Sequence, residues 1–203
     1  TIALFSFLIL IMSVVVHEVS HGIVALWQGD ETAKRAGRLT LNPISHIDLF
    51  GSILFPLACI LLSTGVILGW AKPVPINPYN FKNRRFGEAL VSLAGPASNI
   101  LIALIAGLYV RFMGAGIPIY MTDLLQTTVL INLVLAIFNL VPLPPLDGSK
   151  ILYAFFPEKM SRFIRAFESY GLIVTLLFVF LFIRVLDPVI IFIYRLIVGV
   201  YKS

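Results

Sequence analysis

The stretch IALFSFLILIMSVVVHEVSHGIVALW, residues 2–27, decides the fold. It is apolar almost throughout and long enough for one helix to cross the hydrocarbon core of a bilayer. Near its end it carries three ionisable side chains, His17, Glu18 and His21. An ionisable group in hydrocarbon is costly unless it is satisfied inside the protein or used in its function. The stretch therefore predicts a membrane helix whose ionisable side chains form a functional site.

The whole chain has the composition of a membrane protein. Of its 203 residues, 59% are hydrophobic and 12% are charged, and the mean hydropathy is +0.99. Apolar runs recur from end to end, which predicts an all-α polytopic membrane protein with four to six hydrophobic segments and small extended or re-entrant pieces at the interface. The single cysteine, Cys59, lies among apolar neighbours and is expected to be inert.

The net charge of +5 comes from scattered Lys and Arg residues, without the aromatic residues that interleave with basic patches in nucleic-acid-binding proteins. No nucleic-acid partner is expected, and the basic residues instead indicate topology. Three lie in residues 28–49, four in 72–87, four in 142–169 and none in 113–127. The positive-inside rule places the first three segments on the cytoplasmic side.

This topology bears on the apolar run 49–71, because both of its flanks then face the same side. The run is expected to be re-entrant and to line a cavity, although a full span remains an alternative. The remaining apolar segments are 88–112, a run that ends at Val141 before PLPPLDG, and 170–201. The last of these predicts either one span plus an interfacial piece or a helical hairpin. An amphipathic segment, 148–169, precedes it.

The motif HEVSH, residues 17–21, has the spacing of a zinc site. On a helix His17 and His21 project from one face, so two imidazoles can bind one zinc ion, and Glu18 can act as general base. The alternative is that both histidines only form hydrogen bonds inside a helical bundle. That alternative does not explain why three ionisable residues share this spacing on one apolar helix.

Catalytic zinc needs a third protein ligand. Asp147 is the candidate, because it is the only carboxylate between Asp123 and Glu158 and directly follows a predicted span. The alternative for its Asp-Gly pair is an ordinary turn. His46, in a polar loop, is the competing ligand, and an interfacial position is the simpler interpretation of that residue.

Three motifs in order carry a resemblance to a known family. HEVSH, GPASN at 95–99 and NLVPLPPLDG at 139–148 together resemble the site-2 protease family of intramembrane zinc metalloproteases. GRLTLNPISHID (37–48) and GWAKPVPINPYN (69–80) resemble its small prokaryotic branch, which lacks PDZ and CBS domains. The resemblance covers roughly residues 10–155 and implies one integral-membrane metalloprotease domain over 1–203, with the C-terminal hydrophobic segments in 170–201.

The resemblance also implies roles for single residues. His17, His21 and Asp147 would bind one Zn²⁺ per chain, Glu18 would be the general base, and Asn139 would orient substrate or stabilise the oxyanion. Two further asparagines, Asn99 and Asn132, are expected to have structural roles as hydrogen-bonding residues between helices.

The implied reaction is zinc-dependent hydrolysis of peptide bonds within or near the transmembrane segments of membrane proteins, as in regulated intramembrane proteolysis. The protein would be a multi-pass protein of a prokaryotic plasma membrane, in contact with the lipid bilayer; the sequence indicates no oligomeric state. A helical substrate must be extended before attack, and strand addition to an edge would achieve this. RLTLN (38–42) and AKPVPIN (71–77) would offer that edge, or they are plain interfacial loops.

Two other functions fit parts of the sequence. Ionisable residues inside a bundle also mark the pathways of ion or metal transporters. A non-proteolytic family member could bind zinc and act as a membrane scaffold, but the residues expected for catalysis are all present in this chain.

Overall fold

The computed structural model describes residues 2–61, 70–113, 116–155 and 171–199. Within these ranges the protein is helical and contains no β-strand. The α-helices are α1 (Ile2–Trp27), α2 (Thr32–Arg35), α3 (Phe55–Leu61), α4 (Arg84–Met113), α5 (Ile119–Asn139), α6 (Asp147–Tyr153) and α8 (Gly171–Val198). Two 3-10 turns, η1 (Pro43–His46) and η3 (Pro78–Asn80), and a π-helical turn, η2 (Leu49–Leu54), lie in the connections.

Three helices are long and apolar enough to cross a membrane. They are Leu4–Trp27, Phe86–Met113 and Ile119–Asn139, which belong to α1, α4 and α5. The prediction of a polytopic helical membrane protein is therefore confirmed. The first helix has the predicted bounds, whereas α4 begins four residues before the predicted 88–112.

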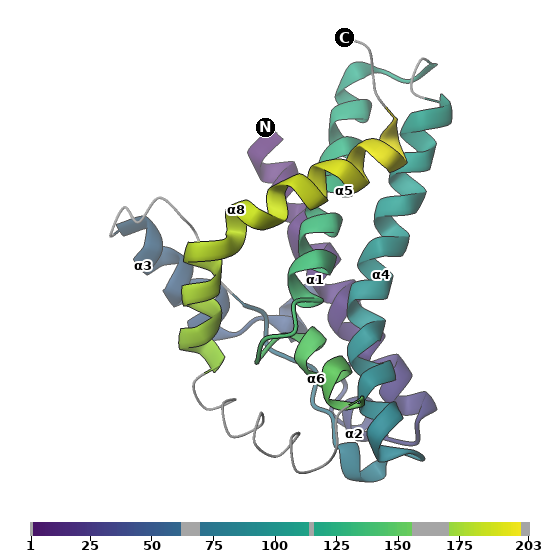
Figure 1. The fold of residues 1–203 in the computed structure, drawn as a ribbon, viewed down its shortest axis with the longest axis vertical. Coiled ribbons are helices and arrows are strands. Elements are labelled where there is room, and N and C mark those ends of the chain that lie inside the picture. Colours follow the sequence, from purple (N-terminus) through teal and green to yellow (C-terminus); the bar gives the residue numbers. More distant parts are fainter. Residues whose placement is uncertain (1, 62–69, 114–115, 156–170, 200–203) are drawn as a thin grey trace.

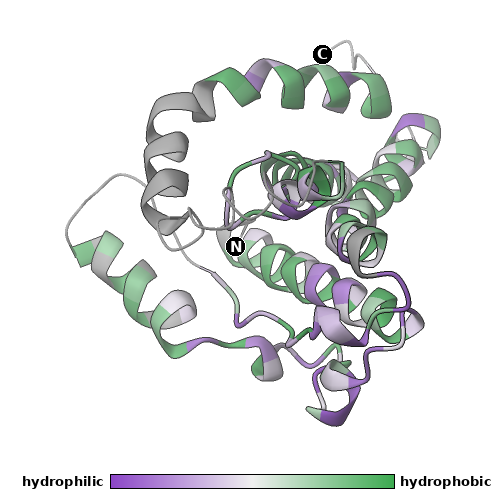
Figure 2. Ribbon diagram, turned by 60° about the horizontal axis from the view of Figure 1, so that its bottom comes forward, coloured by the Kyte–Doolittle hydropathy of each residue, from purple (hydrophilic) through white to green (hydrophobic). Residues whose placement is uncertain are grey.

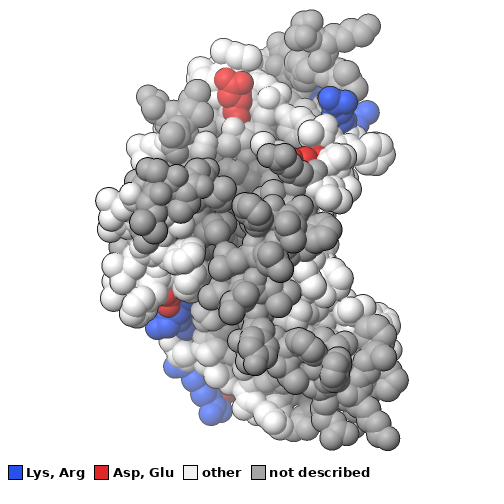
Figure 3. Space-filling model, turned by 60° about the vertical axis from the view of Figure 1, so that its left-hand side comes forward, with Lys and Arg blue, Asp and Glu red and all other residues white. Residues whose placement is uncertain are grey.

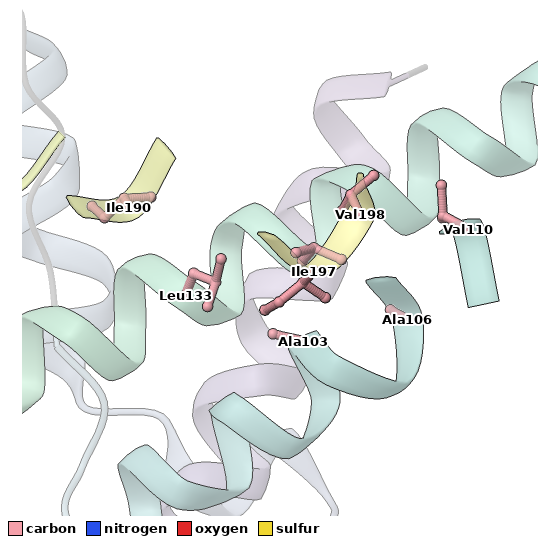
Figure 4. Packing of buried hydrophobic residues seen from close by; sticks show 8 residues of the cluster. Ala103, Ala106, Val110, Leu133, Ile190, Ile197 and Val198 are labelled. Carbon is pink, nitrogen blue, oxygen red and sulfur yellow. The ribbon is translucent and has the colours of Figure 1, made fainter. Parts of the chain in front are cut away.

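The helices α1, α4 and α5 pack against one another, and α8 crosses the upper part of α4 and α5 (Figure 1). Small and branched residues fill the contact of α4, α5 and α8: Ala103, Ala106, Val110, Val129, Leu133, Ile190, Ile197 and Val198 (Figure 4). Small side chains let helices approach closely in lipid, where packing replaces the hydrophobic effect as the driving force. Apolar residues dominate the long helices in Figure 2, and hydrophilic residues gather in the connections.

Two of the three basic segments, 28–49 and 72–87, lie together at one end of the described structure. Lys82 N–H donates to the Gln28 carbonyl and Lys72 N–H to the His46 carbonyl, so the connections before and after α3 lie together. The turn between α4 and α5, which belongs to the segment 113–127 without Lys or Arg, lies at the opposite end (Figure 1). This arrangement agrees with the topology predicted from the Lys and Arg residues.

A buried carboxylate ties these connections to the end of α1. Gly29 adopts a φ of 104°, a left-handed conformation that glycine accommodates, and α1 ends there. Asp30 follows, is 0% exposed, and accepts hydrogen bonds from Asn77 N–H at 2.7 Å and from Asn80 Nδ2 at 2.8 Å. Burial alone would raise the pKa of Asp30, but these bonds and those from Thr32 hold its pKa below the usual value.

The segment 49–71 returns to the level at which it begins. Trp70 N–H donates to the Gly51 carbonyl at 3.1 Å, and Ser52 Oγ donates to the Trp70 carbonyl at 2.9 Å. A single span would separate its two ends by the thickness of the bilayer. The described ends of the segment therefore agree with the re-entrant alternative and not with a full span; residues 62–69 lie outside the described part.

For RLTLN (38–42) and AKPVPIN (71–77) the structure agrees with the alternative, interfacial loops, because neither segment is paired in a strand. In RLTLN the chain turns directly from α2 into η1. AKPVPIN is extended, and the N–H groups of Lys72, Val74 and Asn77 bond within the protein, while positions 73 and 75 are prolines without a donor.

The C-terminal segment is one helix, α8, so the alternative of a helical hairpin is excluded for residues 171–198. Pro188 stands inside α8 and cannot donate to the backbone of Arg184, and α8 changes direction along its length (Figure 1). Of the predicted amphipathic segment 148–169, α6 covers the beginning, and residues 156–169 lie outside the described part. On the face in Figure 3, charged side chains stand near the upper end and along the lower left edge, and the described surface between them is uncharged.

Candidate metal centre

Three side chains from two helices converge on one point. His17 and His21 project from the same face of α1, and their Nε2 atoms lie 3.0 Å apart. Oδ2 of Asp147, the first residue of α6, lies 3.2 Å from each of these nitrogens. Within the described residues, this is the one group of His, Cys, Asp and Glu side chains close enough together to hold a metal ion, with ligand atoms within 4.8 Å of one another.

The other nitrogen of each imidazole is held by an oxygen on α4. His17 Nδ1 lies 2.6 Å from Asn99 Oδ1, and His21 Nδ1 lies 2.6 Å from the Val91 carbonyl. Both oxygens are acceptors, so each Nδ1 carries the proton and each Nε2 presents a lone pair. Two lone pairs and a carboxylate oxygen then face one another at hydrogen-bond distance. A cation at their meeting point satisfies all three, so the residues present fit a metal with nitrogen and oxygen ligands.

Gly95 gives α4 its close approach to the two imidazoles. A Cβ atom at this position would lie 2.5 Å from His17 Nε2 and closer still to His21 Nε2. The helix backbone therefore forms one wall of the site, and no side chain fits there. Gly95 belongs to the GPASN motif, and the sequence alone gives no sign that it faces the histidines.

Asp147 is brought to the histidines by the turn after α5. The prolines of PLPPLDG end the helix, as predicted, and α6 begins at Asp147. A Cβ on Gly148 would collide with the Leu140 carbonyl, so the chain folds back tightly at this point. The Asp147 side chain is 13% exposed, so its carboxylate meets the two imidazole nitrogens largely out of contact with solvent.

Glu18 lies beside the cluster and is held from the opposite side. The backbone N–H of Val74, in the extended segment 71–77, donates to Glu18 Oε2 at 2.9 Å. That segment is fixed in turn, because Arg38 donates to the Lys72 carbonyl at 2.8 Å. Segment 71–77, which was expected either to offer a strand edge to substrate or to be an interfacial loop, thus holds the candidate base in this structure.

The remaining candidates lie apart from the cluster or support it. Asn139, on the last turn of α5, is half-buried and donates through Nδ2 to the Leu135 carbonyl at 2.9 Å. His46, the competing ligand, is buried elsewhere with Nε2 at 2.9 Å from the Thr40 carbonyl. Asn99 and Asn132 bond each other at 2.8 Å across α4 and α5, as expected of residues between helices.

Comparison with known proteins finds several that resemble this chain. The model of "Peptidase family M50" matches residues 110–183, which include Asp147. YwhC of Bacillus subtilis, a protein named as a zinc metalloprotease, is 44% identical over 174 residues, 82% of this chain and 76% of YwhC. Rip2 of Mycolicibacterium smegmatis, named likewise, is 29% identical over 170 residues, 81% of this chain and 62% of Rip2.

A third relative is archaeal. The zinc metalloprotease MJ0392 of Methanocaldococcus jannaschii is 28% identical over 153 residues, 75% of this chain and 34% of that protein. The chain thus spans less than two thirds of Rip2 and of MJ0392. No solved structure matches the chain significantly. The names describe peptidases, and none describes a transporter.

Proposed function

Because the chain belongs to peptidase family M50, the site-2 protease family of zinc metalloproteases, we propose that it hydrolyses peptide bonds within or near the transmembrane segments of other membrane proteins. The observation that carries the proposal is the convergence of Asp147 with His17 and His21, which lie on a helix long enough to cross a membrane. A hydrolytic centre at that place can reach bonds that soluble proteases cannot.

In this proposal His17, His21 and Asp147 hold one zinc ion. The support is the inward direction of both Nε2 lone pairs and the position of the Asp147 carboxylate, 3.2 Å from each of them. Zinc bound there supplies a Lewis acid for the scissile carbonyl and for water. Three protein ligands leave a fourth position for these reactants.

Glu18 is the general base of the proposed reaction. It directly follows His17 on α1, and the Val74 N–H holds its carboxylate in place. The carboxylate takes a proton from the attacking water and passes it to the leaving amine. Asn139 is proposed to stabilise the oxyanion through the second hydrogen of Nδ2, because the first is donated to Leu135.

The wider assignments follow from the same proposal. The substrates are transmembrane proteins cut as in regulated intramembrane proteolysis, and the chain works as one integral-membrane domain over residues 1–203. It resides in a prokaryotic plasma membrane and crosses it several times. The apolar helices α1, α4 and α5 support these assignments, as does the position of the two basic segments 28–49 and 72–87 at one end.

The test is cleavage of a panel of single-span membrane proteins by purified protein in detergent, with zinc measured on each preparation. Wild type is compared with Glu18→Gln and with Glu31→Gln, a matched control whose carboxylate pairs with Arg35 on the exposed surface. We expect all three to hold zinc, and wild type and Glu31→Gln alone to cut. A Glu18→Gln protein that cuts as fast as wild type contradicts the assigned base.

A non-proteolytic scaffold gives a different pattern in the same experiment. All three proteins then hold zinc, and none cuts any substrate. Absence of zinc from the wild type, even after addition of the metal, contradicts the assigned ligands.

A further inference from the structure

Asn99 and Asn132 form a buried polar network beside the candidate metal centre. Both side chains are 0% exposed. Asn99 Nδ2 donates to Asn132 Oδ1 at 2.8 Å and to the Ser13 carbonyl at 3.3 Å. Asn132 Nδ2 donates to Ser13 Oγ at 2.9 Å and to the Thr128 carbonyl at 2.9 Å. Each carboxamide thus has two acceptors for its two N–H hydrogens.

This network fixes which atom of Asn99 faces His17. A carboxamide can be turned over to exchange its oxygen and nitrogen, but here the nitrogen already has two acceptors. Oδ1 must therefore point to His17 Nδ1, 2.6 Å away. The imidazole donates in this bond, and its Nε2 lone pair is directed at Asp147.

The two histidines differ in what holds them. His21 Nδ1 bonds the Val91 carbonyl, which belongs to the backbone of α4 and is present whatever the side chain. His17 depends on a side chain, and that side chain depends on Asn132 and Ser13. A simple tie between α4 and α5 would need only the bond between the two asparagines.

We propose that Asn99, oriented by Asn132 and Ser13, is a positioning residue that holds His17 in the tautomer and direction needed to bind the metal. The inference rests on the proposed ligands His17, His21 and Asp147. Groups that hydrogen-bond a metal-binding imidazole fix its tautomer and raise its basicity, and their removal commonly weakens metal binding by about 10- to 100-fold.

The test measures the zinc affinity of the purified full chain in detergent by competition with a chromophoric chelator. Asn99→Leu has a similar volume but no acceptor, and we expect about 10- to 100-fold weaker binding. Asn99→Asp keeps an oxygen facing Nδ1 and should bind zinc more tightly than Asn99→Leu. Asn132→Leu should weaken binding less than Asn99→Leu does, because it releases Asn99 without removing its oxygen.

Thr128→Val is the matched control. It removes a hydroxyl that bonds the Leu124 carbonyl at 2.9 Å, one turn before Asn132 on α5, and leaves the backbone carbonyl of residue 128 in the network. Its zinc affinity should equal that of wild type. If Asn99→Leu cannot be purified in folded form, Asn132→Leu and Asn99→Asp carry the comparison.

Two failures can be told apart. Wild-type zinc affinity in both Asn99→Leu and Asn132→Leu overturns the positioning role and leaves the proposed function intact. A comparable loss in Thr128→Val also overturns it, because any disturbance of α5 would then suffice. Failure of His17→Ala to weaken zinc binding instead contradicts the proposed ligands themselves.

Discussion

Replacing Gly95 by alanine should destroy the metal centre through a single methyl group. The new Cβ would lie 2.5 Å from His17 Nε2 and 2.6 Å from His17 Cε1, and His21 Nε2 would be closer still. Ordinary van der Waals contact begins near 3.4 Å. The imidazole of His17 must therefore move by about 0.9 Å, or α4 must move away from α1 by a similar amount.

A displacement of this size exceeds what metal coordination tolerates. Ligand distances at a metal site are held to within about 0.2 Å, and a misplacement of about 1 Å in an active site can cost about 100-fold in rate. We expect Gly95→Ala to lose at least about that factor in cleavage rate and to bind zinc weakly. Intrinsic helix propensity predicts the opposite sign for stability, because alanine is favoured over glycine in a helix interior by about 1 kcal/mol.

The assay measures zinc affinity by chelator competition and cleavage of a single-span substrate, with thermal unfolding as a check of folding. Gly107→Ala is the control on the same helix. Its Cβ would meet Ile197 and Val129, which are apolar side chains of the α4, α5 and α8 core. It should alter stability and leave zinc affinity unchanged. Wild-type zinc affinity and cleavage in Gly95→Ala would refute the inferred approach of α4 to the histidines.

Three other changes test separate parts of the structure. Asp147→Asn removes the carboxylate ligand and should weaken zinc binding by more than about 100-fold, as measured by chelator competition. This loss exceeds the largest loss expected for a residue that only hydrogen-bonds a ligand, because Asp147 is itself a proposed ligand. Val74→Pro removes the N–H that holds Glu18 and should reduce kcat by up to about 100-fold, the smallest rate factor expected of a general base. The zinc content should not change. An unchanged kcat contradicts the orienting role of Val74. Asp30→Asn should lower the free energy of unfolding at neutral pH by about 1–3 kcal/mol. Because folding lowers the pKa of Asp30, this stabilisation is present above its ordinary pKa of 3.8 and is lost as the pH falls through the folded value. The unfolding midpoints of wild type and Asp30→Asn should therefore converge in acid, and a constant difference contradicts the assignment.

The sequence predicted those features that depend on local periodicity. Residues 2–27 were predicted as one helix because the apolar run is uninterrupted, and α1 has these bounds. The convergence of His17 and His21 follows from their spacing of four on a helix. Asp147 was predicted as the third ligand because it is the only carboxylate between Asp123 and Glu158. Its carboxylate lies 3.2 Å from Nε2 of both histidines, since prolines end α5 shortly before it and the chain turns back.

Features that depend on contacts between distant segments were harder to predict. RLTLN was expected to offer a strand edge or to be a loop, and it is a loop, because a strand needs a partner and none lies beside these residues in the described structure. AKPVPIN is extended as its prolines require, and three of its donors bond Glu18, Asp30 and His46. Local propensity indicated the backbone conformation here, and tertiary contacts decided its partners.

The roles of Gly95 and Asn99 can nevertheless be related to the sequence once the helix pairing is known. His21 bonds Val91 and His17 bonds Asn99, so α1 and α4 run antiparallel through the site. His17 and His21 are four residues apart, about 6 Å along α1, whereas their acceptors are eight residues apart, about 12 Å along α4. The two imidazoles therefore diverge toward their acceptors while their Nε2 atoms meet 3.0 Å apart, and the residue between the acceptors must leave room for both rings. The order Val91, Gly95 and Asn99 supplies a backbone carbonyl, open space and a carboxamide at that spacing, which explains why α4 can approach a metal centre that a larger residue at position 95 would exclude.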